Sequence, residues 1–99
     1  MRKETIETIN INDLYTYNLS RIKYLKIYNS LIIDLPKKLI NLETLILNNC
    51  HYIKIIPSYK KLKILEIYDC NNLIKLPNDL INLQNLTINN CPNLNYLQL

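Results

Sequence analysis

The sequence predicts a solenoid, a short right-handed coil in which each turn adds one strand to a parallel β-sheet on the concave face. Three observations predict this fold. One apolar pattern recurs along the chain, it recurs at a nearly constant spacing, and each copy alternates apolar and polar residues over the length of a strand. We expect extended or 3₁₀ segments on the convex face and little true helix.

The repeated pattern is clearest in Leu42-x-x-Leu45-x-Leu47-x-x-Cys50. Matching copies begin at Ile22, Leu62 and Leu83, and a weaker copy can be read from Ile6. The second apolar residue of the pattern moves from Leu25 to Leu45, Leu65 and Leu86, in steps of 20, 20 and 21 residues. A fixed period in this range is typical of a solenoid, whose units bury their apolar sides only against their neighbours.

This pattern resembles that of leucine-rich repeat proteins, L-x-x-L-x-L-x-x-N/C-x-L, over nearly the whole chain from about Ile6 to Leu99. The second half of each unit carries Leu35-Pro36, Ile56-Pro57 or Leu76-Pro77, which is similar to the leucine-proline subtype of plant immune receptors and some bacterial effectors. An extra residue after the cysteine, as in Cys50-His51-Tyr52-Ile53, is a departure that is familiar in the same subtype. The resemblance implies a single domain that binds a protein through its concave face.

Each element follows from its place in the repeat. We expect strands near 9–11, 25–27, 45–47, 65–67 and 86–88, all parallel because each return segment crosses the opposite side of the coil. A unit of 20 or 21 residues leaves no room for a full helix on the return, and Pro36, Pro57 and Pro77 favour extended or 3₁₀ turns there. Within domain 1–99, the predicted units are a degenerate one at about 6–21 and repeats at about 22–41, 42–61, 62–82 and 83–99.

The repeat also predicts the core. From the strands we expect burial of Leu25, Ile27, Leu45, Leu47, Leu65, Ile67, Leu86 and Ile88, and from the returns burial of Leu35, Leu39, Ile53, Ile56, Leu73, Leu76, Leu80 and Leu94. Cys50, Cys70 and Cys91 occupy the Asn/Cys position of the family, where a buried side chain bonds loop backbone groups, and Ser30 fills the same position. Without a Cys-x-x-Cys pair and with one histidine, the chain predicts neither a disulfide nor a metal site.

Composition narrows the class of protein. The chain has 99 residues, 48% of them hydrophobic, and contains no Gly, Trp or Phe. Asn, Ile, Leu, Lys and Tyr dominate, which is similar to proteins of A/T-rich genomes such as those of giant amoebal viruses. The polar start lacks the apolar stretch of a signal peptide or membrane span, so we expect a cytoplasmic protein that binds no membrane.

The positive charge raises nucleic acid as a partner. The formal net charge is +4 and the pI is about 9.0. The basic residues are spread, however, with Lys37, Lys38, Lys60 and Lys61 on the convex return and concave lysines alternating with glutamates. A specific nucleic-acid site is therefore not expected.

Exposed strand positions form columns across the concave face. The column Glu7, Lys23, Glu43, Lys63 and Gln84 alternates in charge and predicts weak cross-strand ion pairs with a structural role. A second column follows the strands and predicts turn formers, with the alternative that some of them line the edge of a binding face: Asp13, Asn29, Asn49, Asp69 and Asn90.

The remaining columns mix Tyr and Ile with Lys, Glu and Asn, as protein contact patches do. They predict a partner-binding face made of Tyr24, Lys26, Tyr28, Ile46, Asn48, Ile64, Glu66 and Tyr68. We find no catalytic residues, no cofactor site and no enzyme motif; His51 beside Cys50 comes nearest, but Cys50 is expected to point inward.

Two alternatives stay open at this stage. The C-terminal end, with Leu94, Leu97 and Leu99, has no capping segment in the pattern, so the chain could be a structural protein that associates with itself through that end. It could also be a remnant of a longer repeat protein with no present partner. The identity of a protein partner cannot be read from these residues.

Overall fold

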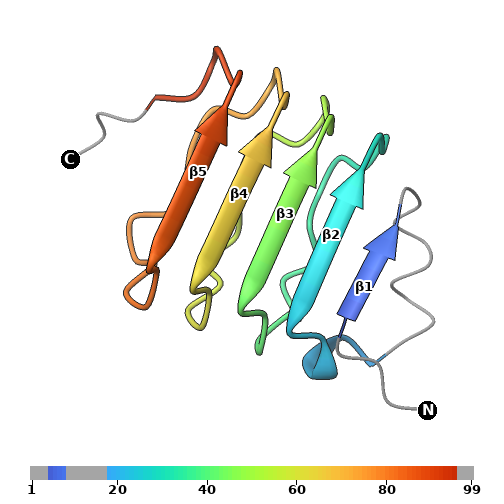
Figure 1. The fold of residues 1–99 in the computed structure, drawn as a ribbon, viewed down its shortest axis with the longest axis vertical. Coiled ribbons are helices and arrows are strands. Elements are labelled where there is room, and N and C mark those ends of the chain that lie inside the picture. The colour runs from blue at the N-terminus through green and yellow to red at the C-terminus, as the bar shows by residue number, and fades with distance from the viewer. Residues whose placement is uncertain (1–4, 9–17, 96–99) are drawn as a thin grey trace.

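A computed structural model describes residues 5–8 and 18–95 and shows a parallel β-solenoid that is consistent with a short leucine-rich repeat coil. Its strands lie side by side in chain order in one five-stranded sheet, and each pairs in parallel with the next (Figure 1). They are β1 (Thr5–Thr8), β2 (Tyr24–Tyr28), β3 (Thr44–Asn48), β4 (Ile64–Tyr68) and β5 (Asn85–Asn89). The predicted fold class is confirmed.

Strands β2, β3 and β4 form where the sequence alternates most regularly. Their second and fourth residues are buried, while the first, third and fifth are more accessible. The buried residues are all Leu or Ile, so one face of the sheet lies on the core and the other faces outward. We call the outward side the open sheet face; it is the face that the sequence analysis predicted to bind a partner.

The register from β2 to β5 is the predicted one. Leu25 pairs with Leu45, Leu45 with Leu65, and Leu65 with Leu86, so equivalent repeat positions stack across neighbouring strands.

The prediction for the first coil was wrong in its register. Ile6, not Ile9, pairs with Leu25, and Glu7 pairs with Lys26 rather than standing in line with Lys23. The strand predicted at 9–11 lies outside the described residues. Ile6 precedes Leu25 by 19 residues, close to the period of the later coils, whereas Ile9 precedes it by only 16. A complete turn of the coil therefore requires Ile6 in the core position, where it is buried.

The return segments are extended, as predicted. A second, shorter parallel ladder runs along them: the Ile74 amide donates to the Lys54 carbonyl at 2.8 Å, and the Asn95 amide donates to the Ile74 carbonyl at 3.1 Å. Within the described part of the chain, the helical content is one 3₁₀ turn, η2 (Leu19–Arg21), which Asn18 caps before β2 begins. No helix among residues 5–8 and 18–95 has the length and apolar character needed to cross a membrane.

The turn after each of strands β2 to β5 is closed by a residue in the left-handed region. Asn29, Asn49, Asp69 and Asn90 have φ of 50°, 58°, 54° and 55°. Asn and Asp tolerate this region better than other residues with a Cβ, and the chain has no glycine for the task. The prediction that these residues form turns is confirmed. Their side chains also bond across coils, since the Asn49 amide donates to Asn29 Oδ1 at 2.8 Å and the Asn90 amide donates to Asp69 Oδ1 at 2.7 Å.

One apolar core runs through all the coils and contains most of the predicted residues. It also includes residues that the sequence analysis did not assign to it: Ile6, Ile22, Ile32, Leu42, Tyr59 and Leu62. The prediction was wrong for Leu86, which is 48% exposed, and incomplete for Leu76, Leu80 and Ile88, which are only partly buried. These four residues lie in or next to the last coil, where β5 has a neighbouring strand on one side only.

The three cysteines are buried, as predicted, and each carries a free thiol. Each thiol lies near the carbonyl oxygen of the residue two positions earlier, and Cys50 Sγ is 3.6 Å from the carbonyl oxygens of both Asn48 and Ile27. The contact with Ile27 joins adjacent coils. A hydrogen bond with Cys50, followed by burial, raises the pKa of the Cys70 thiol, and burial raises the pKa of the Cys91 thiol.

Candidate interaction face

The structure brings all eight predicted partner-binding residues together on the open sheet face. They occupy the outward positions of β2, β3 and β4, and the strand pairing arranges them in three rows. The rows are Tyr24, Thr44 and Ile64; Lys26, Ile46 and Glu66; and Tyr28, Asn48 and Tyr68. Thr44 completes the first row and is the one member of the three rows that the prediction did not include.

The side chains of this face are similarly exposed, and none of them projects far beyond its neighbours. Tyr28 is 36% exposed, and the other seven predicted residues are half-buried. Because adjacent parallel strands lie about 4.8 Å apart, neighbours in a row cover each other's flanks. The face therefore offers a continuous surface whose side chains lose little further freedom when a partner covers them.

On strand β4, a hydrogen bond joins two residues of the face. The Tyr68 hydroxyl donates to Glu66 Oε1 at 2.6 Å. This bond to a carboxylate raises the pKa of Tyr68, because the phenol must give up the bond to ionise and the neighbouring charge opposes a second negative group. The phenol and the carboxylate thus hold each other in place before any partner arrives.

A shallow hollow of about 240 Å³ lies where β2 and β3 end. Lys26, Tyr28, Asn29 and Asn48 line it, so it offers one cation, one phenol and two amides. Such groups suit a carbonyl or carboxylate of a partner. The sequence analysis treated Asn29 as a turn former and left open that some residues of its column line the binding edge; Asn29, directly after Tyr28, lies at that edge.

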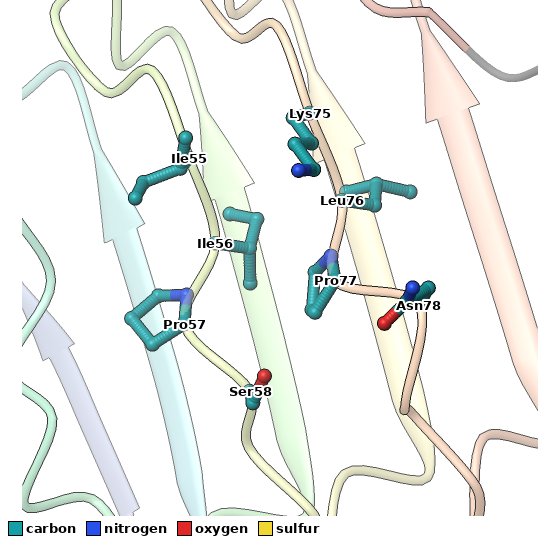
Figure 2. Close-up of a pocket in the computed structure, with 8 residues that line it drawn as sticks. All are labelled: Ile55, Ile56, Pro57, Ser58, Lys75, Leu76, Pro77 and Asn78. Atoms are coloured by element: carbon teal, nitrogen blue, oxygen red, sulfur yellow. The ribbon is translucent and has the colours of Figure 1, made fainter. Parts of the chain in front are cut away.

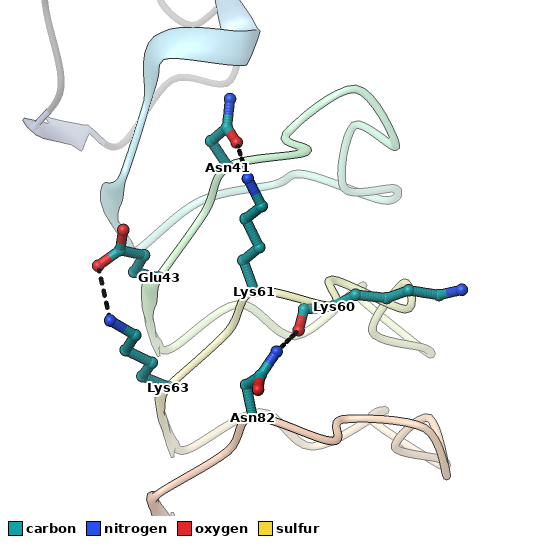
Figure 3. A network of polar contacts seen from close by, with 6 residues as sticks. All are labelled: Asn41, Glu43, Lys60, Lys61, Lys63 and Asn82. Carbon is teal, nitrogen blue, oxygen red and sulfur yellow. Dashed lines mark hydrogen bonds and ion pairs between the residues drawn. The ribbon is translucent and has the colours of Figure 1, made fainter.

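The opposite end of the strands carries the predicted charged column. Lys63 Nζ lies 3.6 Å from Glu43 Oε1, on neighbouring coils (Figure 3). Both side chains are well exposed, so this ion pair contributes little to stability. It limits the face at the edge where the strands begin.

Next to this pair, polar side chains join successive coils before each strand begins. The Asn41 amide donates to the Ser20 carbonyl at 2.6 Å, Lys61 Nζ donates to Asn41 Oδ1 at 2.7 Å, and the Asn82 amide donates to the Lys60 carbonyl at 2.8 Å. Figure 3 shows the last two of these bonds on adjacent turns. They tie the beginnings of the strands together and support the face from the side.

A second depression lies on the return side. It has a volume of about 390 Å³ and runs between two neighbouring return segments, as the side chains in Figure 2 show. Its lining is Ile55, Ile56, Pro57 and Ser58 on one coil and Lys75, Leu76, Pro77 and Asn78 on the next. The sequence analysis proposed no site there. Figure 2 shows the Ile56 side chain between the two coils, and the Leu-Pro or Ile-Pro step of each coil contributes to the lining.

The described residues hold no cluster of three or more His, Cys, Asp or Glu side chains placed to bind a metal ion. His51, the nearest candidate for a catalytic group, lies in the turn after β3 and is half-buried, while the thiol of Cys50 beside it is fully buried. A reagent in solution therefore cannot reach the Cys50 thiol and His51 together.

Comparisons of this chain with models of protein families, with curated proteins and with solved structures find no match.

Proposed function

We propose that this chain is a non-catalytic interaction module of the leucine-rich repeat type, which binds a protein partner through the open sheet face. The observation that carries the proposal is the assembly of Tyr28, Ile46 and Tyr68 with their neighbours on adjacent strands of one sheet. Tyr is one of the residue types that are enriched among the hot spots of protein interfaces, and Ile46, on the strand between those of the two tyrosines, adds apolar contact area.

The charges on the face favour a protein over a polyanion. Strands β2 to β4 and their flanking residues carry three cations, Lys23, Lys26 and Lys63, and three anions, Glu43, Glu66 and Asp69. A nucleic acid requires a positive surface, and this one is balanced. Neighbouring charges of opposite sign select among protein partners instead, because a wrong partner brings like charges together.

The location that we propose for the module is the cytoplasm. Its three thiols are free and buried. A reducing compartment keeps such thiols free, whereas disulfides form and persist in the oxidising environment of secreted proteins.

Affinity capture with matched variants tests the proposal. The test variant carries Tyr28→Ala, Ile46→Ala and Tyr68→Ala. The control variant carries Ile40→Ala, Tyr52→Ala and Ile81→Ala, which removes three exposed apolar side chains away from the open sheet face. Circular dichroism checks that both variants fold. A captured protein is then purified, and its dissociation constant is measured by calorimetry against each variant.

We expect the test variant to weaken binding at least about tenfold and the control to leave it within about twofold of the wild-type value, because loss of a central aromatic side chain commonly costs more than about 1 kcal/mol. Equal affinity for all three proteins would refute the open sheet face as the site. Loss of binding only in the control variant would move the site to the return side.

A further inference from the structure

At the outer edge of β5, core residues are exposed, and no strand among residues 5–8 and 18–95 pairs with that edge. Leu86 is 48% exposed, whereas Leu25, Leu45 and Leu65 at the same repeat position are fully buried. Ile88 is likewise only partly buried, although its equivalent Ile67 is fully buried. Both side chains point to the core side of the sheet, so whatever covers the edge must bring apolar groups to that side.

The backbone bonds of β5 show which peptide groups face the free edge. The Asn85 amide donates to the Lys63 carbonyl at 3.0 Å, and the Asn89 carbonyl accepts from the Asp69 amide at 2.9 Å. Residues 85, 87 and 89 thus direct their peptide groups toward β4. Because this direction alternates along a strand, the N–H and C=O groups of Leu86 and Ile88 point outward.

Charge distinguishes this edge from the rest of the molecule. Charged residues make up 20% of the chain, yet no Asp, Glu, Lys or Arg occurs from Leu80 to Leu99. Exposed edge strands normally avoid pairing by means of charged side chains, prolines or bulges. Strand β5, with the sequence Asn-Leu-Thr-Ile-Asn, has no charge and no proline.

We propose that the outer edge of β5 binds a second copy of this chain, with the two β5 strands antiparallel about a two-fold axis at Thr87. This register places Leu86 of each copy opposite Ile88 of the other, which gives two equivalent pairs. The two residues of each such pair exchange hydrogen bonds through the peptide groups that face outward. On the core side the same pairs bury the exposed Leu86 side chains. On the open sheet face Thr87 meets its own copy, and Asn85 meets Asn89.

A second copy fits this edge better than an unrelated protein because of the missing charges. In a two-fold contact every residue near the axis meets its own copy, so any charge there is repelled by an equal charge. A different partner could complement charges and gain specificity from them. Because β5 carries no charged side chain, no like charges would meet anywhere along the paired strands.

The contact does not depend on the proposed function. A two-fold axis perpendicular to the sheet keeps the open sheet faces of both copies on the same side. The dimer would therefore present two copies of the candidate interaction face on one continuous sheet, and a partner with two matching sites would gain affinity by avidity.

Sedimentation velocity over a range of protein concentrations tests the proposal. We expect a concentration-dependent dimer for the wild-type chain. Thr87→Lys places two like charges side by side at the axis, so we expect it to weaken dimerisation at least about tenfold. The control Asn78→Lys adds the same charge at an exposed position on the return side and should leave the dimer unchanged. A wild-type chain that stays monomeric up to several hundred micromolar, or a Thr87→Lys dimer as tight as the wild type, would overturn the proposal.

Cysteine crosslinking tests the register. Thr87 and its copy form a non-hydrogen-bonded pair, the kind with the shorter Cα separation, so Thr87→Cys should form an intermolecular disulfide under mild oxidation. Asn85→Cys should not, because position 85 lies opposite position 89 of the second copy. Peptide mapping separates these crosslinks from any that involve the buried native thiols. Faster crosslinking of the Asn85→Cys protein would overturn the two-fold register, and open-ended oligomers would indicate head-to-tail stacking instead.

Discussion

The hydroxyl of Tyr59 donates a 2.6 Å hydrogen bond to the carbonyl oxygen of Pro36, one coil earlier. Tyr59 is 3% exposed and takes the core position that Leu39 and Leu80 occupy in the neighbouring repeats. Its unit is one residue shorter at this point, with one residue between Pro57 and Tyr59 where the other two repeats have two. The larger side chain thus fills the core beside a shortened return and also binds a buried backbone acceptor of the adjacent coil.

Removal of this hydroxyl should destabilise the protein more than its size suggests. Tyr59→Phe leaves the Pro36 carbonyl without this bond in a buried setting, and we expect a loss of about 1–3 kcal/mol in the free energy of unfolding. Urea titration followed by circular dichroism measures it. The control Tyr52→Phe removes the hydroxyl of an exposed tyrosine and should change stability by less than about 0.5 kcal/mol. Equal effects of the two substitutions would refute a structural role for the Tyr59 hydroxyl.

The left-handed turns should discriminate between two small substitutions at one site. Asn49→Ala places a Cβ in the left-handed region and removes the amide that binds Asn29, so we expect a loss of about 1–2 kcal/mol in unfolding free energy. Asn49→Gly loses the same amide bond but relieves the backbone, so it should cost less than Asn49→Ala. Thermal unfolding of the pair checks this order, with the exposed Asn72→Ala as a reference. An Ala variant as stable as the Gly variant would contradict the backbone explanation.

Equivalent leucines in different coils should differ in their contribution to stability. Leu65→Ala empties a fully buried position between two coils and should cost about 2–5 kcal/mol. Leu86→Ala makes the same chemical change at a half-exposed position, and in the monomer it should cost less than half as much. Denaturant titration at a concentration low enough to keep the chain monomeric separates this effect from self-association. A larger loss for Leu86→Ala would mean that another part of the monomer covers this residue.

The cysteines should resist labelling in the folded protein. Cys50, Cys70 and Cys91 are buried, so a reagent in solution does not reach them, and the raised pKa values of Cys70 and Cys91 also keep those two thiols protonated at pH 8. In the native protein, we expect a thiol-reactive dye to modify all three cysteines only as fast as the protein unfolds. In roughly 6–8 M urea, which unfolds small domains, we expect the dye to modify them within minutes. Rapid modification of all three in the native state would refute the core position of the cysteines and the face defined from it.

The bond between Tyr68 and Glu66 predicts a particular pH dependence. The pKa of Tyr68 is raised in the folded state, so folding favours the protonated phenol. Its contribution to stability is complete below the unfolded pKa of about 10 and declines as the pH rises above that value toward the folded pKa. NMR titration of ¹³C-labelled tyrosine, with Tyr68→Phe for assignment, measures the shift. Glu66→Gln removes the carboxylate and should lower the Tyr68 pKa; an unchanged value would exclude that carboxylate as the cause.

The sequence was sufficient to predict the fold in those coils where each residue has the same neighbours as its equivalents in the other coils. The spacing of Leu25, Leu45 and Leu65 predicted the register of β2 to β5, because the same contacts recur in every coil. It misplaced the first strand because the segment before Ile22 has no Leu-Pro step to mark its phase. It also assigned Leu86 to the core, since a repeated pattern does not show which coil has a neighbour on one side only.

The candidate site was predicted to a similar extent and for the same reason. The rows of the open sheet face follow from the alternation of the strands, so all eight residues were found together. The hollow beside Lys26, which includes Asn29, depends on the three-dimensional course of the turn after β2 and could not be read from periodicity. The Tyr68–Glu66 bond depends on rotamers, which the pattern does not encode either.

The left-handed turns have a consequence for how such a chain can lengthen. Asn49 and Asn90 each bond to the corresponding side chain of the preceding turn, and Asn29 and Asp69 provide acceptors of the same geometry. A duplication of the segment that carries Asn49 or Asn90 would bring its own strand, its own turn residue and an amide that can donate to the previous turn. Tandem duplication of whole segments can therefore add coils without changes to the existing ones, and each added coil would widen the open sheet face by one strand.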